Sequence, residues 1–105
     1  MNEGFTKIGE AKDIPSSTMK VYDLAGESVC IVNTEGNCYA IGNICTDEGG
    51  PLNEDAIEGY NVECAWHGSK FDVRTGTVTE PPAELPVQSY EVKIEDGDNF
   101  IRKIN

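Results

Sequence analysis

Positive charge is scarce in this 105-residue chain, which has eight Lys and Arg residues against 19 Asp and Glu residues and a formal charge of −11. A surface of that sign repels phosphate backbones and anionic lipids, so nucleic acid and acidic membranes are not expected partners. The same charge can steer the chain toward a basic patch on another protein, or it can simply keep the chain in solution.

Long hydrophobic runs are also missing. The chain has no stretch of about 18 apolar residues, and its first residues, MNEGFTKIGE, lack the basic start and apolar run of a secretion signal. We therefore expect a cytoplasmic protein with no membrane segment. Because the cytosol keeps thiols reduced, the four cysteines are expected to be metal ligands or free thiols rather than a disulfide framework.

The sequence contains no helical apolar period of useful length, but short segments rich in Val, Ile, Tyr and Phe alternate with turn residues. This pattern predicts an all-β domain. We expect hairpins at residues 21–32, 28–41, 69–78 and 90–104, the last with its turn at 96–99, and a meander over the first forty residues. Any helix would be a turn or two at 11–14 or 53–57.

Two further features concern the loops. Residues 80–86 contain three prolines, which exclude a helix interior and a central strand, so this segment is expected to be an extended surface connection. Residues 43–64 are punctuated by glycines and are expected to be loop with brief strands. Tyr90, Val92 and Ile94 are expected to share one face of the last hairpin.

Two short clusters contain side chains that bind metals, Cys45-Thr46-Asp47 and Cys64-Ala65-Trp66-His67. Each spacing places two candidate ligands on one tight loop, and two such loops complete a four-ligand shell. Thiolates select zinc or iron-sulfur clusters over magnesium or calcium. The candidate ligands are therefore Cys45, Asp47, Cys64 and His67.

Both clusters lie in segments that resemble the Rieske family. Residues 45–52, CTDEGGPL, resemble its first loop, Cys-x-His-x-Gly-x-x-Leu, and residues 64–72, CAWHGSKFD, resemble its second loop, Cys-x-x-His-Gly-x-x-Phe-Asp. Residues 74–76 and the pair Pro81-Pro82 also match, so the resemblance extends over residues 5–104. It implies one Rieske-type domain of stacked antiparallel sheets, with a base at 1–42 and 84–105 and a loop-rich cluster-binding part at 43–83.

The resemblance also implies the cofactor, a 2Fe-2S cluster in which two cysteines hold one iron and two histidines hold the other. Cys45 and Cys64 would bind the first iron, and His67 would bind the second. Asp47 occupies the remaining histidine position, and no other residue can restore the usual pair because His67 is the only histidine. The chain therefore departs from the family at one ligand.

Asp47 either ligates the second iron or lies in an open turn, with Glu48, water or an external ligand in its place. If Asp47 ligates, the oxidised centre carries a charge of −1 instead of zero. One charge at about 4 Å and an effective dielectric constant of about 20 lowers the reduction potential by on the order of 150 mV. A carboxylate also suits iron among sulfides less well than imidazole does, and one imidazole that couples proton and electron transfer is lost.

Other residues around the two loops have two interpretations each. Trp66 and Phe71 either cover the cluster or belong to the core. Ser69 and the backbone N–H groups around Gly49, Gly50 and Gly68 can donate hydrogen bonds to the sulfurs, although the glycines can also serve only the turns.

The two remaining cysteines, Cys30 and Cys38, match no ligand position and are expected to be buried free thiols and cross-strand neighbours. In Rieske proteins of respiratory complexes a disulfide joins the two cluster loops, but the corresponding positions here are Gly50 and Trp66. The chain therefore resembles the soluble ferredoxins of oxygenase systems.

This resemblance implies a monomeric one-electron carrier that passes electrons from an NAD(P)H-dependent reductase to a terminal oxygenase or a similar acceptor. A free-standing oxygenase is excluded, because its second iron needs two further histidines. The alternative is a Rieske scaffold, natural or engineered, in which the two cysteines, the aspartate and the histidine bind a single zinc or iron ion or a modified cluster. A metal-free interaction domain is disfavoured because three of the family's four ligands are present.

Overall fold

The computed structural model describes residues 4–24, 26–44, 52, 57–64, 68–81 and 83–104. Within these residues the chain forms ten β-strands and one short 3-10 helix, η1 (Ala11–Asp13), in agreement with the predicted all-β class. The helix lies in the first of the two segments where the sequence allowed one. Of the second segment only Ile57 is described, and it begins a strand. No helix among the described residues is long and apolar enough to cross a membrane.

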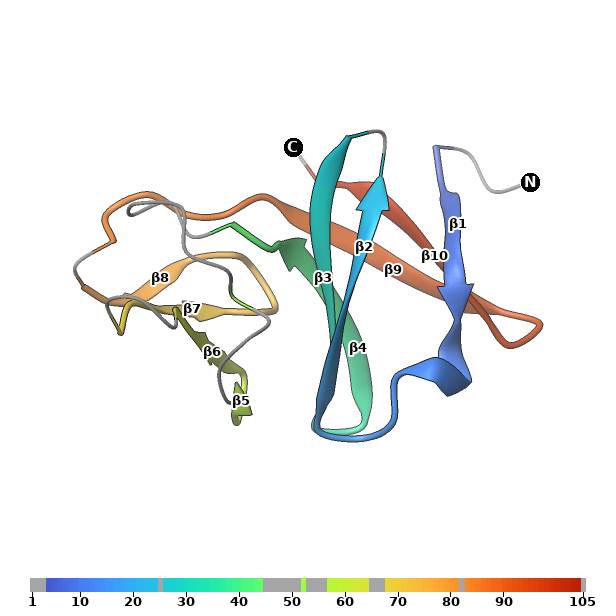
Figure 1. The fold of residues 1–105 in the computed structure, drawn as a ribbon, viewed down its shortest axis with the longest axis horizontal. Coiled ribbons are helices and arrows are strands. Elements are labelled where there is room, and N and C mark those ends of the chain that lie inside the picture. Colours follow the sequence, from blue (N-terminus) through green and yellow to red (C-terminus); the bar gives the residue numbers. More distant parts are fainter. Residues whose placement is uncertain are drawn as a thin grey trace.

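The strands form two antiparallel sheets at opposite ends of the elongated molecule (Figure 1). In order across the larger sheet, its six strands are β1 (Thr6–Glu10), β10 (Asp98–Lys103), β9 (Ser89–Glu95), β4 (Asn37–Gly42), β3 (Glu27–Thr34) and β2 (Thr18–Leu24). The smaller sheet contains β5 (Ile57–Glu58), β6 (Asn61–Glu63), β7 (Lys70–Asp72) and β8 (Val78–Glu80). The predicted hairpins are confirmed as the pairs β2–β3, β3–β4, β7–β8 and β9–β10.

Two turns set the register of the longest hairpins. Glu35 and Gly36 connect β3 to β4, and Asp96 and Gly97 connect β9 to β10; all four residues have positive φ between 52° and 83°. Two successive residues with positive φ form the tight turn that matches the twist of paired strands. The predicted turn at 96–99 was therefore two residues too long, because residues 98 and 99 already belong to β10.

Strand β1 was not predicted. It pairs with β10 at the opposite end of the chain, from Thr6 opposite Ile101 to Glu10 opposite Asp98. The meander predicted for the first forty residues is therefore limited to β2, β3 and β4, and β1 adds an edge strand to the C-terminal hairpin.

Strand β3 is buried on both faces and separates two hydrophobic cores. Val29 and Ile31 project into the core inside the larger sheet, together with Ile14, Ala40, Tyr90 and Ile101. Cys30 and Val32 project into the core between the two sheets, together with Ile41, Leu52, Val62, Cys64, Phe71, Val73, Ala83 and Val87. A strand that is buried on both faces is apolar without interruption, and residues 29–32 of β3 form such a run. The second core carries the candidate ligand Cys64.

Candidate metal centre

Of the four predicted ligands, the structure describes Cys64. Cys45, Asp47 and His67 lie outside the described residues, as do Glu48, Trp66 and the glycines at 49 and 50. Within the described part of the chain, no group of three or more His, Cys, Asp or Glu side chains is placed to hold a metal ion. The ligand set therefore stays a prediction. The structure does show the surroundings of Cys64 and the residues at the ends of the two loops.

Cys64 directly follows β6 and is 1% exposed. Its N–H donates to the carbonyl of Ser69 over 2.7 Å, and its own carbonyl accepts from the N–H of Gly68 over 3.0 Å. These bonds continue the β6–β7 pairing, which runs from Asn61 opposite Asp72 to Glu63 opposite Lys70. The hairpin therefore fixes the backbone at 64 and at 68–69, on either side of residues 65–67, which lie outside the described residues.

The first loop is also closed at its ends. The N–H of Asn43 donates to the carbonyl of Ser28 over 3.0 Å, and the N–H of Leu52 donates to the carbonyl of Asn43 over 2.7 Å. Leu52 is fully buried in the same core as Cys64, whereas Ile44 is 50% exposed. Residues 43 and 52, which lie on either side of the segment containing Cys45 and Asp47, are thus anchored beside the core that holds Cys64.

The proline connection is attached to the second loop by a buried hydroxyl. The N–H of Ala83 donates to Oγ of Ser69 over 3.0 Å, and both residues are buried. Because a serine hydroxyl has one donor hydrogen besides its acceptor lone pairs, accepting this bond leaves the O–H hydrogen of Ser69 available. The expected role of Ser69 as a donor to the cluster is compatible with this geometry.

The β7–β8 turn joins the small sheet to the segment that leads into β9. The N–H of Val87 donates to the carbonyl of Gly76 over 2.9 Å, and the N–H of Gly42 donates to the carbonyl of Gln88 over 2.8 Å. Gly76 has φ of +82°, and a Cβ there would lie 2.3 Å from the carbonyl oxygen of Val87. A glycine at this position is therefore required by conformation and by space.

Replacing Gly76 by Ala should destabilise the fold by roughly 2–4 kcal/mol, from strain at positive φ and from the close contact with Val87. Chemical denaturation measures the loss. Gly59→Ala is the matched control, because Gly59 has φ of +60° but no atom within 4 Å of an added Cβ. Equal losses in the two variants would contradict a special role for the contact between Gly76 and Val87.

One ion pair organises the turn after β7. Arg74 binds Asp72 through Nε at 3.1 Å and Nη2 at 2.8 Å, and its guanidinium lies 4.1 Å from the centre of the Tyr60 ring. The hydrogen bond with Arg74 is the main reason that the pKa of Asp72 lies below its usual value. The family motif residues Asp72 and Arg74 thus hold the turn, a role that sequence spacing alone did not reveal.

Cys30 and Cys38 are free, as expected, but they are not cross-strand neighbours. Cys30 lies opposite Ile41 and Cys38 lies opposite Asn33, because the two-residue turn fixes the register of the hairpin. Cys30 is fully buried, and burial raises its pKa to about 12. Cys38 is only partly buried, so the prediction of two buried thiols is correct for Cys30 alone.

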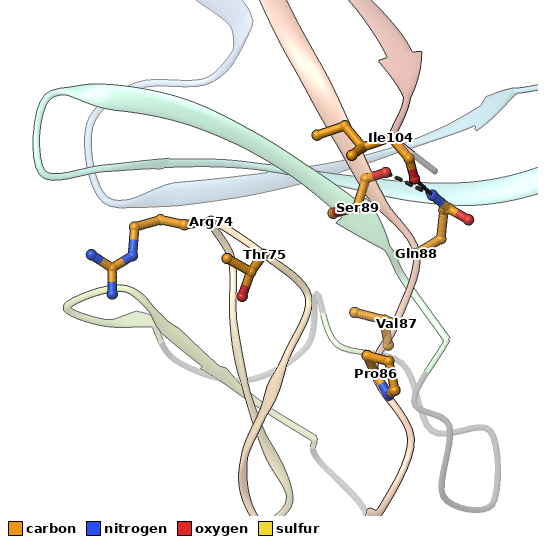
Figure 2. A pocket seen from close by; sticks show the side chains of 7 residues that line it. All are labelled: Arg74, Thr75, Pro86, Val87, Gln88, Ser89 and Ile104. Atoms are coloured by element: carbon orange, nitrogen blue, oxygen red, sulfur yellow. Dashed lines mark hydrogen bonds between the residues drawn. The ribbon is translucent and has the colours of Figure 1, made fainter.

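A pocket of about 500 Å³ lies where the two sheets meet (Figure 2). It is lined by Arg74, Thr75, Pro86, Val87, Gln88, Ser89 and Ile104. The Arg74 guanidinium points away from it, and Nε2 of Gln88 donates hydrogen bonds to the carbonyls of Ser89 and Ile104. The lining therefore offers no pair of groups for acid–base chemistry. None of these residues was predicted as a site.

The predicted donor set suits an iron-sulfur centre. Two thiolates match the preference of iron in a cluster for soft ligands, and an imidazole with a carboxylate can complete the second iron. The burial of Cys64 among apolar residues is also typical of the dry surroundings of such a site. A cluster at this position would supply reversible one-electron transfer.

Comparisons with known proteins identify relatives of two kinds. The chain is 37% identical over 78 residues, 73% of its length, to the ferredoxin component of the p-cumate 2,3-dioxygenase system of Pseudomonas putida. It is 36% identical over 90 residues, 86% of its length, to the cytochrome b6-f complex iron-sulfur subunit of Chlorobaculum tepidum. The matches span 66% and 49% of those two proteins, so the chain corresponds to about half to two thirds of their length.

A solved structure has the same fold. A chain in the complex of reduced oxygenase and oxidised ferredoxin of carbazole 1,9a-dioxygenase superposes with a TM-score of 0.89 and 25% identity, covering 99% of each chain. The family model of the Rieske [2Fe-2S] domain matches residues 4–91, which include both predicted ligand loops. The chain belongs to the Rieske [2Fe-2S] domain family.

Proposed function

We propose that this protein is a one-electron carrier whose 2Fe-2S cluster is held by Cys45 and Cys64 on one iron and by His67 and Asp47 on the other. The observation that supports it most is the family match across both ligand loops, together with the burial of Cys64 at the end of β6. The proposed division into a base at 1–42 and 84–105 and a cluster-binding part at 43–83 belongs to the same proposal.

The described residues prepare the surroundings of the centre. Phe71 and Leu52 are fully buried in the same hydrophobic core as Cys64, so the surroundings of Cys64 are apolar. Ser69 is fixed by the N–H of Ala83 and keeps its own hydrogen to donate. Burial and hydrogen bonds to the sulfurs are two means by which a protein adjusts the potential of such a cluster.

Ser69→Ala should therefore lower the reduction potential by roughly 50–100 mV. A hydrogen bond donated by Ser69 would stabilise the reduced cluster, whose sulfurs are more negative, more than it stabilises the oxidised cluster. Protein-film voltammetry measures the shift. Ser89→Ala, at the start of β9 in the larger sheet, is the control and should leave the potential unchanged. A potential equal to that of the unmodified protein in Ser69→Ala would rule out the hydroxyl as a donor.

The partners that we propose are an NAD(P)H-dependent reductase as donor and a terminal oxygenase or similar protein as acceptor. The p-cumate relative is the ferredoxin component of a dioxygenase system, and the carbazole ferredoxin was solved with its oxygenase. A formal charge of −11 favours partners with basic docking surfaces. We further propose that the carrier is monomeric and cytoplasmic.

The decisive functional test is a two-step assay. The protein is reduced by a reductase of an aromatic-ring dioxygenase system with NADH, and its reoxidation by the oxygenase of that system is followed at several salt concentrations. We expect reoxidation to slow as salt rises, since exposed charges are screened beyond about 10 Å at 0.1 M. Failure of both steps with several such systems would contradict the proposed carrier function.

A matched pair of charge reversals locates the docking surface. Glu84 is exposed in the proline connection next to the buried Ala83, whereas Glu95 is exposed at the end of β9, far from the small sheet (Figure 1). Glu84→Lys should slow reoxidation severalfold at low salt, and Glu95→Lys should have little effect. Equal effects would indicate that only the total charge matters.

A single zinc or iron ion at the same four residues is the second candidate. A tetrahedral set of two cysteines, one aspartate and one histidine favours it, since zinc accepts all three ligand types. The family match favours the cluster, because the matched domain is defined by a [2Fe-2S] centre. Metal and sulfide analysis separates the two.

A further inference from the structure

The two edge strands of the larger sheet, β1 and β2, are not paired with each other. The Tyr22 side chain nevertheless brings them into contact. A Cβ added to Gly9 of β1 would lie 2.7 Å from Oη and 2.9 Å from Cζ of Tyr22 in β2. The Tyr22 ring therefore spans the space between the two edges and lies over the backbone of Gly9.

Asn99 lies next to this contact. The register places Asn99 of β10 opposite Gly9, and residues opposite each other in antiparallel strands project to the same face, with Cβ positions about 4.5–5.5 Å apart. Asn99 is fully buried. Ile101, two residues further and thus on the same face, belongs to the core against which Tyr22 packs. The side chains of Tyr22 and Asn99 therefore project into the same interior.

Three polar atoms at this place are buried without a hydrogen-bond partner among the described residues: Oη of Tyr22, and Nδ2 and Oδ1 of Asn99. Native proteins satisfy nearly all buried polar groups, and each exception calls for an explanation. The two side chains together present donors and an acceptor. They do not bond each other, so a third group that both donates and accepts is needed to satisfy them.

We propose that a buried water molecule binds between Tyr22 and Asn99 and joins the two edges of the larger sheet. Water accepts from the Tyr22 hydroxyl or from Nδ2 of Asn99 and donates to Oδ1, which no simple ion can do. Gly9 supports the site, because any larger residue at position 9 would displace the Tyr22 ring. The site closes the sheet where no backbone pairing links β1 to β2.

A crystal structure of the intact, cluster-loaded protein at high resolution tests the site directly. We expect an ordered water within about 2.6–3.2 Å of Oη of Tyr22 and of one amide atom of Asn99. A direct hydrogen bond between Tyr22 and Asn99, an empty space, or a metal ion at the position would each overturn the proposal.

Native-state hydrogen exchange of the β10 amides tests the link in solution. Tyr22→Phe and Asn99→Leu should each reduce protection about tenfold, since each leaves the other residue without its water-mediated partner. The double variant should lose little more protection than either single variant does. Tyr39→Phe is the control, because Tyr39 packs against the core between the two sheets. Its effect on protection should multiply with that of Asn99→Leu. Independent, multiplying effects of Tyr22→Phe and Asn99→Leu would overturn the proposal.

Discussion

Asp47→His is expected to raise the reduction potential of this protein by on the order of 150 mV, the largest shift that any single substitution should produce. A neutral imidazole in place of the carboxylate removes one negative charge beside the iron that accepts the electron. Reduction then no longer adds an electron to a centre that is already an anion. Voltammetry of the purified protein measures the shift, and the visible spectrum reports the change of ligand.

Asp47→Asn is the matched control for this variant. It keeps the size of the side chain but removes its charge, so it separates the electrostatic effect from the preference of iron for nitrogen. We expect Asp47→Asn to bind the cluster less firmly and Asp47→His to bind it more firmly than the unmodified protein. A potential that stays the same in both variants would show that Asp47 is not a ligand and that Glu48 or water completes the centre.

Cys64→Ser is expected to abolish the cluster, so that iron and sulfide fall from about two each per chain to near zero. A hydroxyl is a much poorer ligand for cluster iron than a thiolate. Serine at this buried position keeps the shape of the side chain, and the backbone bonds of Cys64 to Ser69 and Gly68 do not depend on its sulfur. The fold should therefore survive, which circular dichroism checks.

Cys38→Ser is the control for the loss of a thiol. Cys38 lies in β4, is partly exposed and packs against the core inside the larger sheet, not against the core that contains Cys64. This variant should retain the full iron and sulfide content. Loss of the cluster in Cys38→Ser, or its retention in Cys64→Ser, would contradict the assigned ligands.

The local hairpins were predictable because their signals lie close together in the sequence. Alternating apolar residues around short turns identified the strand pairs β2–β3, β3–β4 and β9–β10. Strand β1 was missed because its partner β10 is about ninety residues away, and no local pattern encodes such a pairing. The relation of Cys30 to Cys38 was wrong because it depended on the exact length of one turn.

The candidate site shows the same limit. Ligand spacing predicted Cys64 as a ligand, and the structure shows that it is buried and that its backbone is bonded to Gly68 and Ser69. The bond from Ala83 to Ser69 and the contact of Gly76 with Val87 join segments more than ten residues apart, so spacing could not reveal them. Both depend on how the proline connection packs over the small sheet.

Analysis of iron, acid-labile sulfide and zinc in the anaerobically purified protein, together with its visible spectrum, tests the central claim most directly. We predict about two irons and about two sulfides per chain, no zinc, and the red-brown colour of a cluster. One zinc, or one iron without sulfide, in a colourless or weakly coloured protein would contradict the carrier function and would establish a single-ion site on a Rieske fold.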